Sequence, residues 1–330
     1  SIAVDANGTV HVAYYDASAN ALRYTSGTSG AWAPPVVVDN LNNAGLYTSI
    51  MLDNAGAPAI AYVATGEARL ARLSGTTWTR ETVATGVTAY LSAARDGLGR
   101  FHLGWQAGTV LTYTRGVPGT WEVPHAADAV PGGQYVRLVL DAQDNPHLFH
   151  YAPTPDDLRH AFSTAQGDAG SFTAEIAAAT GVSGQYAAAA VDAQGNLGAV
   201  FLESGVGMVL AQKNGATWSR LPLNAANYQG GALVLGPNGA WDVVFYDDAL
   251  NNLRAVSSAV PGLAPATVVA PATDPGTWSA MAVDALGTPH VAWRDNRAST
   301  LRYGTLSQGL WFHTTLDDAA VVARRLAEPR

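Results

Sequence analysis

Cysteine is absent from the 330-residue chain, which excludes a disulfide framework, a thiol nucleophile and a thiolate metal site. Lysine occurs once, at Lys213, and charged residues make up only 13% of the sequence. The net charge of −8 argues against nucleic acid as a partner, because phosphate binding needs a basic surface. No apolar run reaches the roughly 18 residues of a membrane span, so no membrane-spanning segment is expected.

What the chain does contain is one pattern repeated along its whole length. Residues 1–16 read SIAVDANGTVHVAYYD, and residues 280–295 read AMAVDALGTPHVAWRD. The pattern recurs around five further positions: Asp53, Asp96, Asp141, Asp192 and Gly236. From Asp5 to Asp284 the intervals are 48, 43, 45, 51, 44 and 48 residues, so seven repeats account for the whole chain.

Each repeat holds four short apolar segments separated by turn signals. In the first repeat these segments are 1–5, 11–16, 21–26 and 32–39. The link Asp5-Ala-Asn-Gly8 is typical of a tight β-hairpin. A closed ring of such units leaves only short, protected strand edges. The sequence therefore predicts an all-β, seven-bladed β-propeller with four antiparallel strands per blade.

The repeat boundaries predict a single domain, 1–330. The expected blades are approximately 1–46, 47–89, 90–134, 135–185, 186–227, 228–277 and 278–318, with a C-terminal tail at 319–330. Three ways of closing the ring stay open at this point. Side chains of blades one and seven pack together, the segment from Asp317 onward adds a closing element, or an extension before Ser1 does so.

The repeats resemble those of bacterial extracellular propellers with the pattern S-x-A-V-D-x-x-G-x-x-H-V-A-Y-x-D, and more remotely those of sialidase-type propellers. This resemblance covers the whole chain and implies the propeller fold and a secreted or cell-surface location. Only the end of the sialidase-type S-x-D-x-G-x-x-W box is present, as in Asn214-Gly-Ala-Thr-Trp218. The sialidase arginine triad has no visible counterpart, so sialidase activity is not implied.

Three repeated positions are expected to be structural. Aspartate is followed six residues later by histidine, as in Asp5 and His11, and the pair is expected to fix a hairpin. The residue nine after the aspartate is expected to pack between blades. It is Tyr14, Tyr62, Trp105, His150, Phe201, Phe245 or Trp293. Arginines on the third strands are expected to pair with acids just upstream: Arg23 with Asp16, Arg159 with Asp157, Arg254 with Asp247 or Asp248, and Arg302 with Asp295.

A fourth repeated position carries the functional prediction. An aromatic residue precedes the innermost strand of six repeats: Tyr47, Tyr90, Tyr135, Tyr186, Tyr228 and Trp278. These residues are expected to line the mouth of the central channel. Flat apolar faces with a polar edge suit sugar rings. The same residues would also suit a plug that fills the space between blades, and the sequence does not separate the two roles.

The sequence favours a secreted or surface-exposed, lectin-like propeller that binds carbohydrate. It favours binding over enzymatic activity. One alternative is a polysaccharide lyase using Arg137, His150 and Tyr151 of the fourth repeat. In it, arginine would neutralise a uronate carboxylate and His or Tyr would move protons. The other is a structural or protein-binding module of an extracellular assembly. No cofactor or metal is predicted, although a structural calcium ion in the channel stays open.

Overall fold

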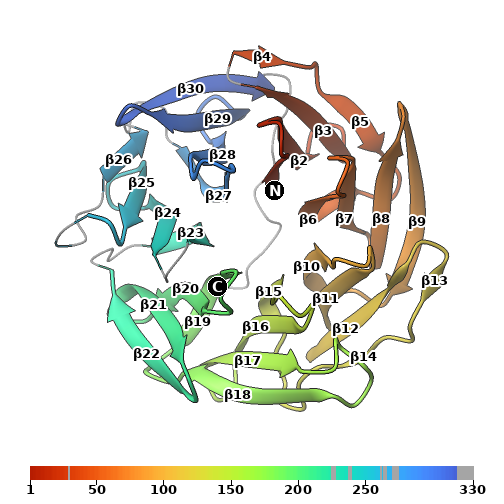
Figure 1. Ribbon diagram of the computed structural model, residues 1–330, viewed down its shortest axis with the longest axis vertical. Coiled ribbons are helices and arrows are strands. Elements are labelled where there is room, and N and C mark those ends of the chain that lie inside the picture. Colours follow the sequence, from red (N-terminus) through yellow and green to blue (C-terminus); the bar gives the residue numbers. More distant parts are fainter. Residues whose placement is uncertain are drawn as a thin grey trace.

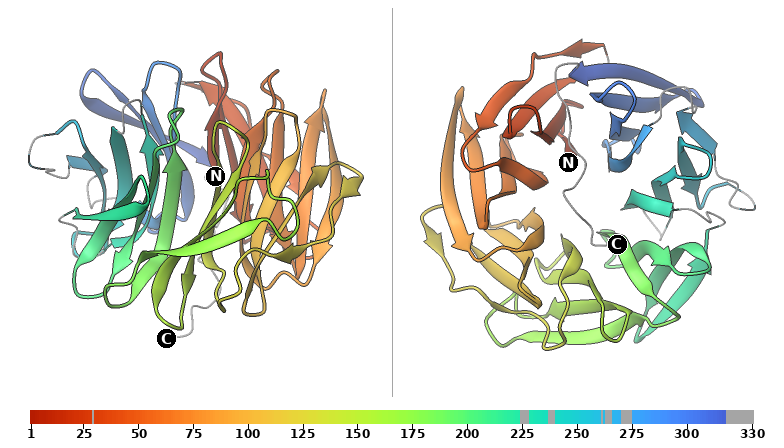
Figure 2. Two further views of the ribbon diagram at one scale, coloured as in Figure 1. Left: turned by 60° about the horizontal axis from the view of Figure 1, so that its bottom comes forward. Right: turned by 180° about the vertical axis from the view of Figure 1, so that it is seen from behind.

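The computed structural model describes residues 1–28, 30–223, 228–236, 240–260, 262, 266–269 and 275–317. Its strands form seven antiparallel sheets around a central channel, which confirms the predicted seven-bladed β-propeller (Figure 1). Figure 2 shows the sheets from the side, running between the two faces of the ring. The predicted tail, 319–330, lies outside the described residues. The described part of the chain has no helix that is long and apolar enough to cross a membrane.

The strands follow one another from the channel outward in every blade. Blade 1 contains β1 (Ile2–Val4), β2 (Val10–Asp16), β3 (Ala21–Thr28), β4 (Ala31–Trp32) and β5 (Val36–Asp39). Blade 2 contains β6 (Ala44–Leu52), β7 (Pro58–Ala64), β8 (Glu67–Ser74) and β9 (Thr77–Thr85). Blade 3 contains β10 (Ala89–Arg95), β11 (Phe101–Ala107), β12 (Val110–Val117), β13 (Thr120–Trp121) and β14 (His125–Ala126). Blade 4 contains β15 (Gln134–Leu140), β16 (Pro146–Ala152), β17 (Asp157–Ser163) and β18 (Phe172–Ala178).

The other three blades have the same order. Blade 5 contains β19 (Ser183–Val191), β20 (Leu197–Glu203), β21 (Gly207–Asn214) and β22 (Thr217–Pro222). Blade 6 contains β23 (Tyr228–Leu235), β24 (Trp241–Asp247), β25 (Asn252–Ser257) and β26 (Ala266–Val269). Blade 7 contains β27 (Pro275–Val283), β28 (Pro289–Asp295), β29 (Thr300–Ser307) and β30 (Leu310–Asp317).

The outer strands of blades 1 and 3 are each split in two, where the sequence predicted one continuous segment. In blade 1, β4 and β5 both pair with β3, and Pro34 and Pro35 lie between them. In blade 3, Pro124 separates β13 from β14. Proline has no N–H to donate to a neighbouring strand, so it interrupts the ladder at these outer edges.

The repeated aspartates fix the hairpins between the first two strands, as predicted. Asp5 Oδ1 accepts the N–H groups of Asn7 (2.9 Å) and Thr9 (2.7 Å). The same two contacts recur at five aspartates: Asp53, Asp96, Asp141, Asp192 and Asp284. The turn needs a left-handed residue, which Gly8 supplies in blade 1 with φ 79°. Histidine adds a contact to some of these turns, and His102 Nε2 lies 3.1 Å from Asp96 Oδ2.

Among the described residues, the core consists of seven apolar clusters, each lying between two neighbouring blades. The cluster between blades 2 and 3, for example, joins Met51, Ala61 and Leu70 to Leu103 and Trp105. The position nine residues after the repeated aspartate lies on the second strand of each blade. It contributes one residue to six of these clusters, and all seven of its residues are buried. This confirms the predicted packing layer, because large aromatic side chains bury the most apolar area.

A repeated serine hydroxyl links each of the first three blades to the next. Ser1 Oγ accepts the N–H of Ile50 at 3.1 Å, and Ser49 Oγ accepts that of Ala93 at 3.1 Å. Ser92 Oγ accepts the N–H of Leu138 at 3.0 Å. The corresponding residues of blades 4 to 7 are Arg137, Ala188, Ala232 and Ala280, none of which carries a hydroxyl.

We expect Ser49→Ala to lower the free energy of unfolding by about 1 kcal/mol, because the Ala93 N–H loses its acceptor inside the ring. Urea denaturation followed by tryptophan fluorescence measures the change. The matched control is Ser74→Ala at the exposed end of β8, which should stay within about 0.5 kcal/mol of the parent. Equal effects of the two substitutions would show that the hydroxyl does not link the blades.

The ring closes by side-chain contacts between blades 7 and 1. Asp317, at the end of β30, accepts hydrogen bonds from the Tyr14 hydroxyl and from Arg23 Nη1 (3.0 Å). An apolar cluster of the same two blades joins Val10 and Val12 to Leu316. Packing therefore closes the ring within the described residues, which is the first of the three options left open by the sequence.

Candidate functional site

Four tyrosines near the start of the innermost strands share a rare backbone conformation. Tyr47, Tyr90, Tyr135 and Tyr186 have φ values of 51°, 56°, 53° and 55°. Each lies where the pairing of the innermost strand with the second strand shifts register. The left-handed conformation costs about 1–2 kcal/mol for a residue with a Cβ. Such strain persists only where the surrounding structure imposes it, and it clusters at functional sites.

Close approach of neighbouring blades explains the local backbone. Gly45 lies two residues before Tyr47, with φ 112°. A Cβ at this glycine would lie 2.8 Å from the Cα of Leu22 in the preceding blade. Gly184, two residues before Tyr186, has the same relation to Leu158 at 2.9 Å. The chain therefore enters the innermost strand pressed against the previous blade, and the bulge then turns the tyrosine.

The aromatic side chains touch one another in a row around the channel. Ring centroids lie 5.5 Å apart for Tyr47 and Tyr90, 4.9 Å for Tyr90 and Tyr135, and 5.1 Å for Tyr135 and Tyr186. Trp278 of blade 7 continues the row at 6.4 Å from Tyr186. We call these five residues the aromatic row. Tyr228 begins β23, and its side chain lies outside the described part of the structure.

Members of the aromatic row differ in how far they are covered. Tyr135 is buried within an apolar cluster, and Tyr90 and Tyr186 pack against the same cluster. Tyr47 and Trp278, at the two ends of the row, line a cavity in the central channel. The middle of the row therefore fills space between blades, whereas its two ends border the cavity.

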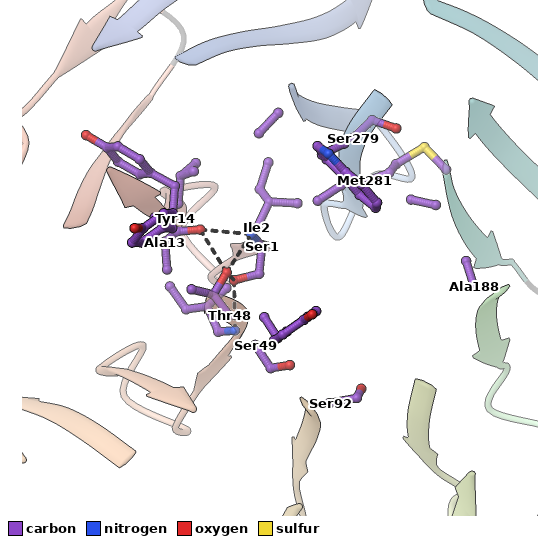
Figure 3. Close-up of a pocket in the computed structure, with 18 of the residues that line it drawn as sticks. Ser1, Ile2, Ala13, Tyr14, Thr48, Ser49, Ser92, Ala188, Ser279 and Met281 are labelled. Atoms are coloured by element: carbon purple, nitrogen blue, oxygen red, sulfur yellow. Dashed lines mark hydrogen bonds between the residues drawn. The ribbon is translucent and has the colours of Figure 1, made fainter. Parts of the chain in front are cut away.

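This hollow, which we call the channel cavity, has a volume of about 460 Å³. Its wall is formed by the innermost strands and by residues of the next strands of blades 1 and 7, mainly of β2 and β28. Figure 3 shows Ser49, Ser92 and Ser279 on different sides of it, with Ile2 and Met281 among the apolar residues. The volume falls in the range of small-molecule sites, and apolar walls with a few polar groups are typical of them.

The charged residues of the cavity wall have one sign. Arg137 of β15 and Arg294 of β28 line the cavity, and no described Asp or Glu does. Ser279 Oγ is buried in the wall and has no hydrogen-bond partner among the described residues. The sequence analysis singled out Arg137 but missed Arg294 and Ser279. The alternation of side chains along β27 and β28 was the available signal for these two.

His150 and Tyr151 do not meet Arg137 in this cavity. His150 is fully buried, and its Nδ1 accepts the N–H of Gly133 at 3.0 Å. Its Nε2–H therefore donates to Asp128 Oδ2, at 3.0 Å. The Tyr151 hydroxyl donates to Asp156 at 2.6 Å, and burial and this carboxylate raise the pKa of Tyr151 to about 12. Neither residue lines the channel cavity, so the lyase hypothesis gains no support from their placement.

His150 belongs instead to a contact that recurs between blades. Asp128 of blade 3 accepts hydrogen bonds from His150 and from Arg159 Nε (2.6 Å) of blade 4. Burial opposes ionisation of Asp128, but these two contacts hold its pKa below its usual value. In the same way, Asp39 of blade 1 accepts hydrogen bonds from Tyr62 and Arg69 of blade 2. His150 thus occupies the same position of the repeat as Tyr62, and like Tyr62 it donates a hydrogen bond to an aspartate of the preceding blade.

The predicted arginine pairs on the third strands need one correction. Arg23 pairs with Asp16 at 2.9 Å, as expected. Arg254 and Arg302 also contact their local acids, at 3.2 Å from Asp247 and 3.5 Å from Asp295. The prediction for Arg159 is wrong, because this side chain pairs with Asp128 of the preceding blade. Sequence spacing does not reveal which of two nearby carboxylates the packing of blades brings closer.

Blade 4 differs from blades 1, 3 and 7 in the buried partner of its hairpin histidine. In blades 1, 3 and 7 the hairpin histidine meets a tyrosine hydroxyl, as between His102 and Tyr113 at 2.6 Å. In blade 4, His147 Nδ1 lies 2.9 Å from Nε2 of His160 instead. His160 Nδ1 donates to Glu175 at 2.9 Å, and Lys213 of blade 5 also contacts Glu175. Burial lowers the pKa of His160 to about 4.

No group of three or more His, Asp or Glu side chains in the described ranges is arranged to hold a metal ion. The calcium ion considered from the sequence remains untested.

No protein-family model matches this chain, and no curated protein matches it. Solved structures do. The BP39L lectin from Burkholderia pseudomallei shares 18% identity with a TM-score of 0.73, over 94% of this chain and 96% of that one. The Aleuria aurantia lectin, solved with Fucα1-6GlcNAc, shares 12% identity with a TM-score of 0.59, over 85% and 98%. A leech intramolecular trans-sialidase shares 11% with a TM-score of 0.51, over 89% and 64%. At these identities the likeness is one of fold.

Proposed function

We propose that this propeller is a lectin-like protein that binds carbohydrate in the channel cavity, with Tyr47 and Trp278 as the stacking residues. The observation that carries the proposal is the aromatic row, whose two ends border a cavity of about 460 Å³. The four tyrosines of this row share a strained backbone conformation, which is the kind of strain that clusters at functional sites.

The wall chemistry agrees with a sugar as ligand. Serine hydroxyls at Ser49, Ser92 and Ser279 lie beside apolar and aromatic surface. A sugar offers the same combination, because its C–H faces stack on aromatic rings and its hydroxyls exchange hydrogen bonds. The lectins among the structural neighbours support this proposal through their shared fold. We also propose a secreted or surface-exposed location, on the resemblance of the repeats to extracellular propellers.

The test combines a glycan array with site variants. Tyr47→Asn removes the aromatic ring but keeps a residue that tolerates a positive φ, so the fold should survive. We expect it to weaken binding of the array hits about tenfold, which corresponds to about 1.4 kcal/mol of lost stacking. Tyr47→Phe retains the ring and should bind within about threefold of the parent. Isothermal titration calorimetry measures both variants.

Phe312→Asn is the matched control, because Phe312 is an exposed aromatic residue on the outer strand β30. It should leave the dissociation constant unchanged. Unchanged binding in both Tyr47→Asn and Trp278→Leu would move the site away from the channel. An array with no hits among neutral and acidic glycans would overturn carbohydrate binding itself.

A further inference from the structure

We propose that the channel cavity selects saccharides that carry a carboxylate, and that Arg137 is the residue that recognises it. This inference rests on the proposed function and adds the charge of the ligand. Three independent features of Arg137 support it: its place in the repeat, the sign of the charge on the cavity wall, and the other groups that line the same cavity.

The repeat shows that the structure does not require arginine at this position. In blades 1 to 3 the residue is a serine whose hydroxyl holds the next blade. Blades 5 to 7 lose this contact and carry alanine: Ala188, Ala232 and Ala280. Alanine is therefore sufficient where the serine contact is absent. Blade 4 alone places a long cationic side chain there, on the wall of the channel cavity.

The charge of the wall contrasts with the charge of the chain. The protein has a net charge of −8, with 26 acidic residues against 18 basic ones. The described residues that line the cavity nevertheless include Arg137 and Arg294 and no carboxylate. A concave site lined by charge of one sign concentrates ligands of the opposite sign. The cavity therefore attracts an anion that the rest of the surface repels.

The chemistry of arginine and its neighbours narrows the anion to an acidic sugar. The planar guanidinium matches a carboxylate with two parallel N–H donors. Ser49, which is half-buried in the same wall, supplies a hydroxyl that can donate a hydrogen bond to a sugar hydroxyl. Tyr47 and Trp278 supply the aromatic faces that a simple inorganic anion would not use. A uronic acid residue within an oligosaccharide uses all three kinds of group.

The experiment compares each acidic ligand with its own neutral form. Oligomers of galacturonic, glucuronic and mannuronic acid are titrated beside their methyl esters, which keep the rings and lose the charge. With the parent protein we expect at least one acid to bind tenfold or more tightly than its ester. Arg137→Ser should remove this preference, lowering affinity for the acid about ten- to hundredfold, as for a lost charged hydrogen bond. Arg137→Lys should retain part of it.

Arg72→Ser is the matched control, since it removes one positive charge from an exposed residue of β8, away from the channel cavity. An equal loss in this variant would show general attraction to the surface and overturn the inference. Acid and ester binding equally well, or a preference that survives in Arg137→Ser, would also overturn it while leaving carbohydrate binding intact. Failure of acids, esters and neutral glycans alike would overturn the proposed function as well. Thermal unfolding of Arg137→Ser confirms that the variant is folded.

Discussion

Replacing Asp317 with alanine is expected to lower the free energy of unfolding by about 2 kcal/mol, because it leaves the buried Tyr14 hydroxyl without its acceptor and removes one of the two carboxylates that pair with Arg23. Asp317 is 6% exposed and receives the Tyr14 hydroxyl and the Arg23 guanidinium across the junction of blades 7 and 1. Burial and this carboxylate raise the pKa of Tyr14, so the phenol remains a donor throughout the working range of pH. Equilibrium unfolding in urea measures the loss.

Two further variants identify the origin of the stability lost in Asp317→Ala. Asp317→Asn keeps an oxygen acceptor without the charge and should lose less than Asp317→Ala. Asp168→Ala removes a carboxylate that also contacts an arginine, Arg115, but is 61% exposed. Exposed pairs contribute little, so this control should change the free energy of unfolding by at most about 1 kcal/mol. A small effect of Asp317→Ala would mean that the apolar cluster around Leu316 closes the ring by itself.

Acidification is expected to destabilise the protein between about pH 6.5 and pH 4, and His160 is the main cause. Its pKa is about 4 in the folded state because the ring is buried, whereas an unfolded histidine titrates near 6.5. A depressed folded pKa contributes stability that is present above pH 6.5 and is lost as the pH falls toward 4. The shift corresponds to about 3 kcal/mol across this window. Urea denaturation at a series of pH values tests it.

His160→Tyr is the matched variant, because blades 1, 3 and 7 carry a tyrosine at this position opposite the hairpin histidine. Three charged or titratable groups act on the His160 ring: His147, Glu175 and Lys213. Asp141 contacts His147 on its far side. Hydrogen bonds from His160 and Lys213, opposed by burial, hold the pKa of Glu175 at about 2, so this carboxylate stays ionised across the window. The variant should therefore show a flatter stability profile between pH 6.5 and 4. An unchanged slope would assign the acid sensitivity to other groups.

The sequence alone determined the architecture because the repeat carries local signals in every copy. In six of the seven repeats an aspartate followed by a left-handed turn residue sets the hairpin, and the backbone contacts of Asp5 and Asp284 show that this needs only neighbouring residues. The second-strand aromatic residues were likewise predictable, since one large apolar side chain per repeat has to be buried between blades.

Only the tertiary structure decided which repeated residues face the channel and which are covered. Tyr47 and Tyr135 occupy the same position of the repeat, yet one lines the cavity and the other is buried. His150 stood out in the sequence as an exception to an aromatic pattern, but packing brings it to Asp128 of the preceding blade. Contacts between blades join residues far apart in the chain, as between Tyr14 and Asp317. Exposure, pairing and charge at the channel follow from those distant contacts, and a local repeat does not encode them.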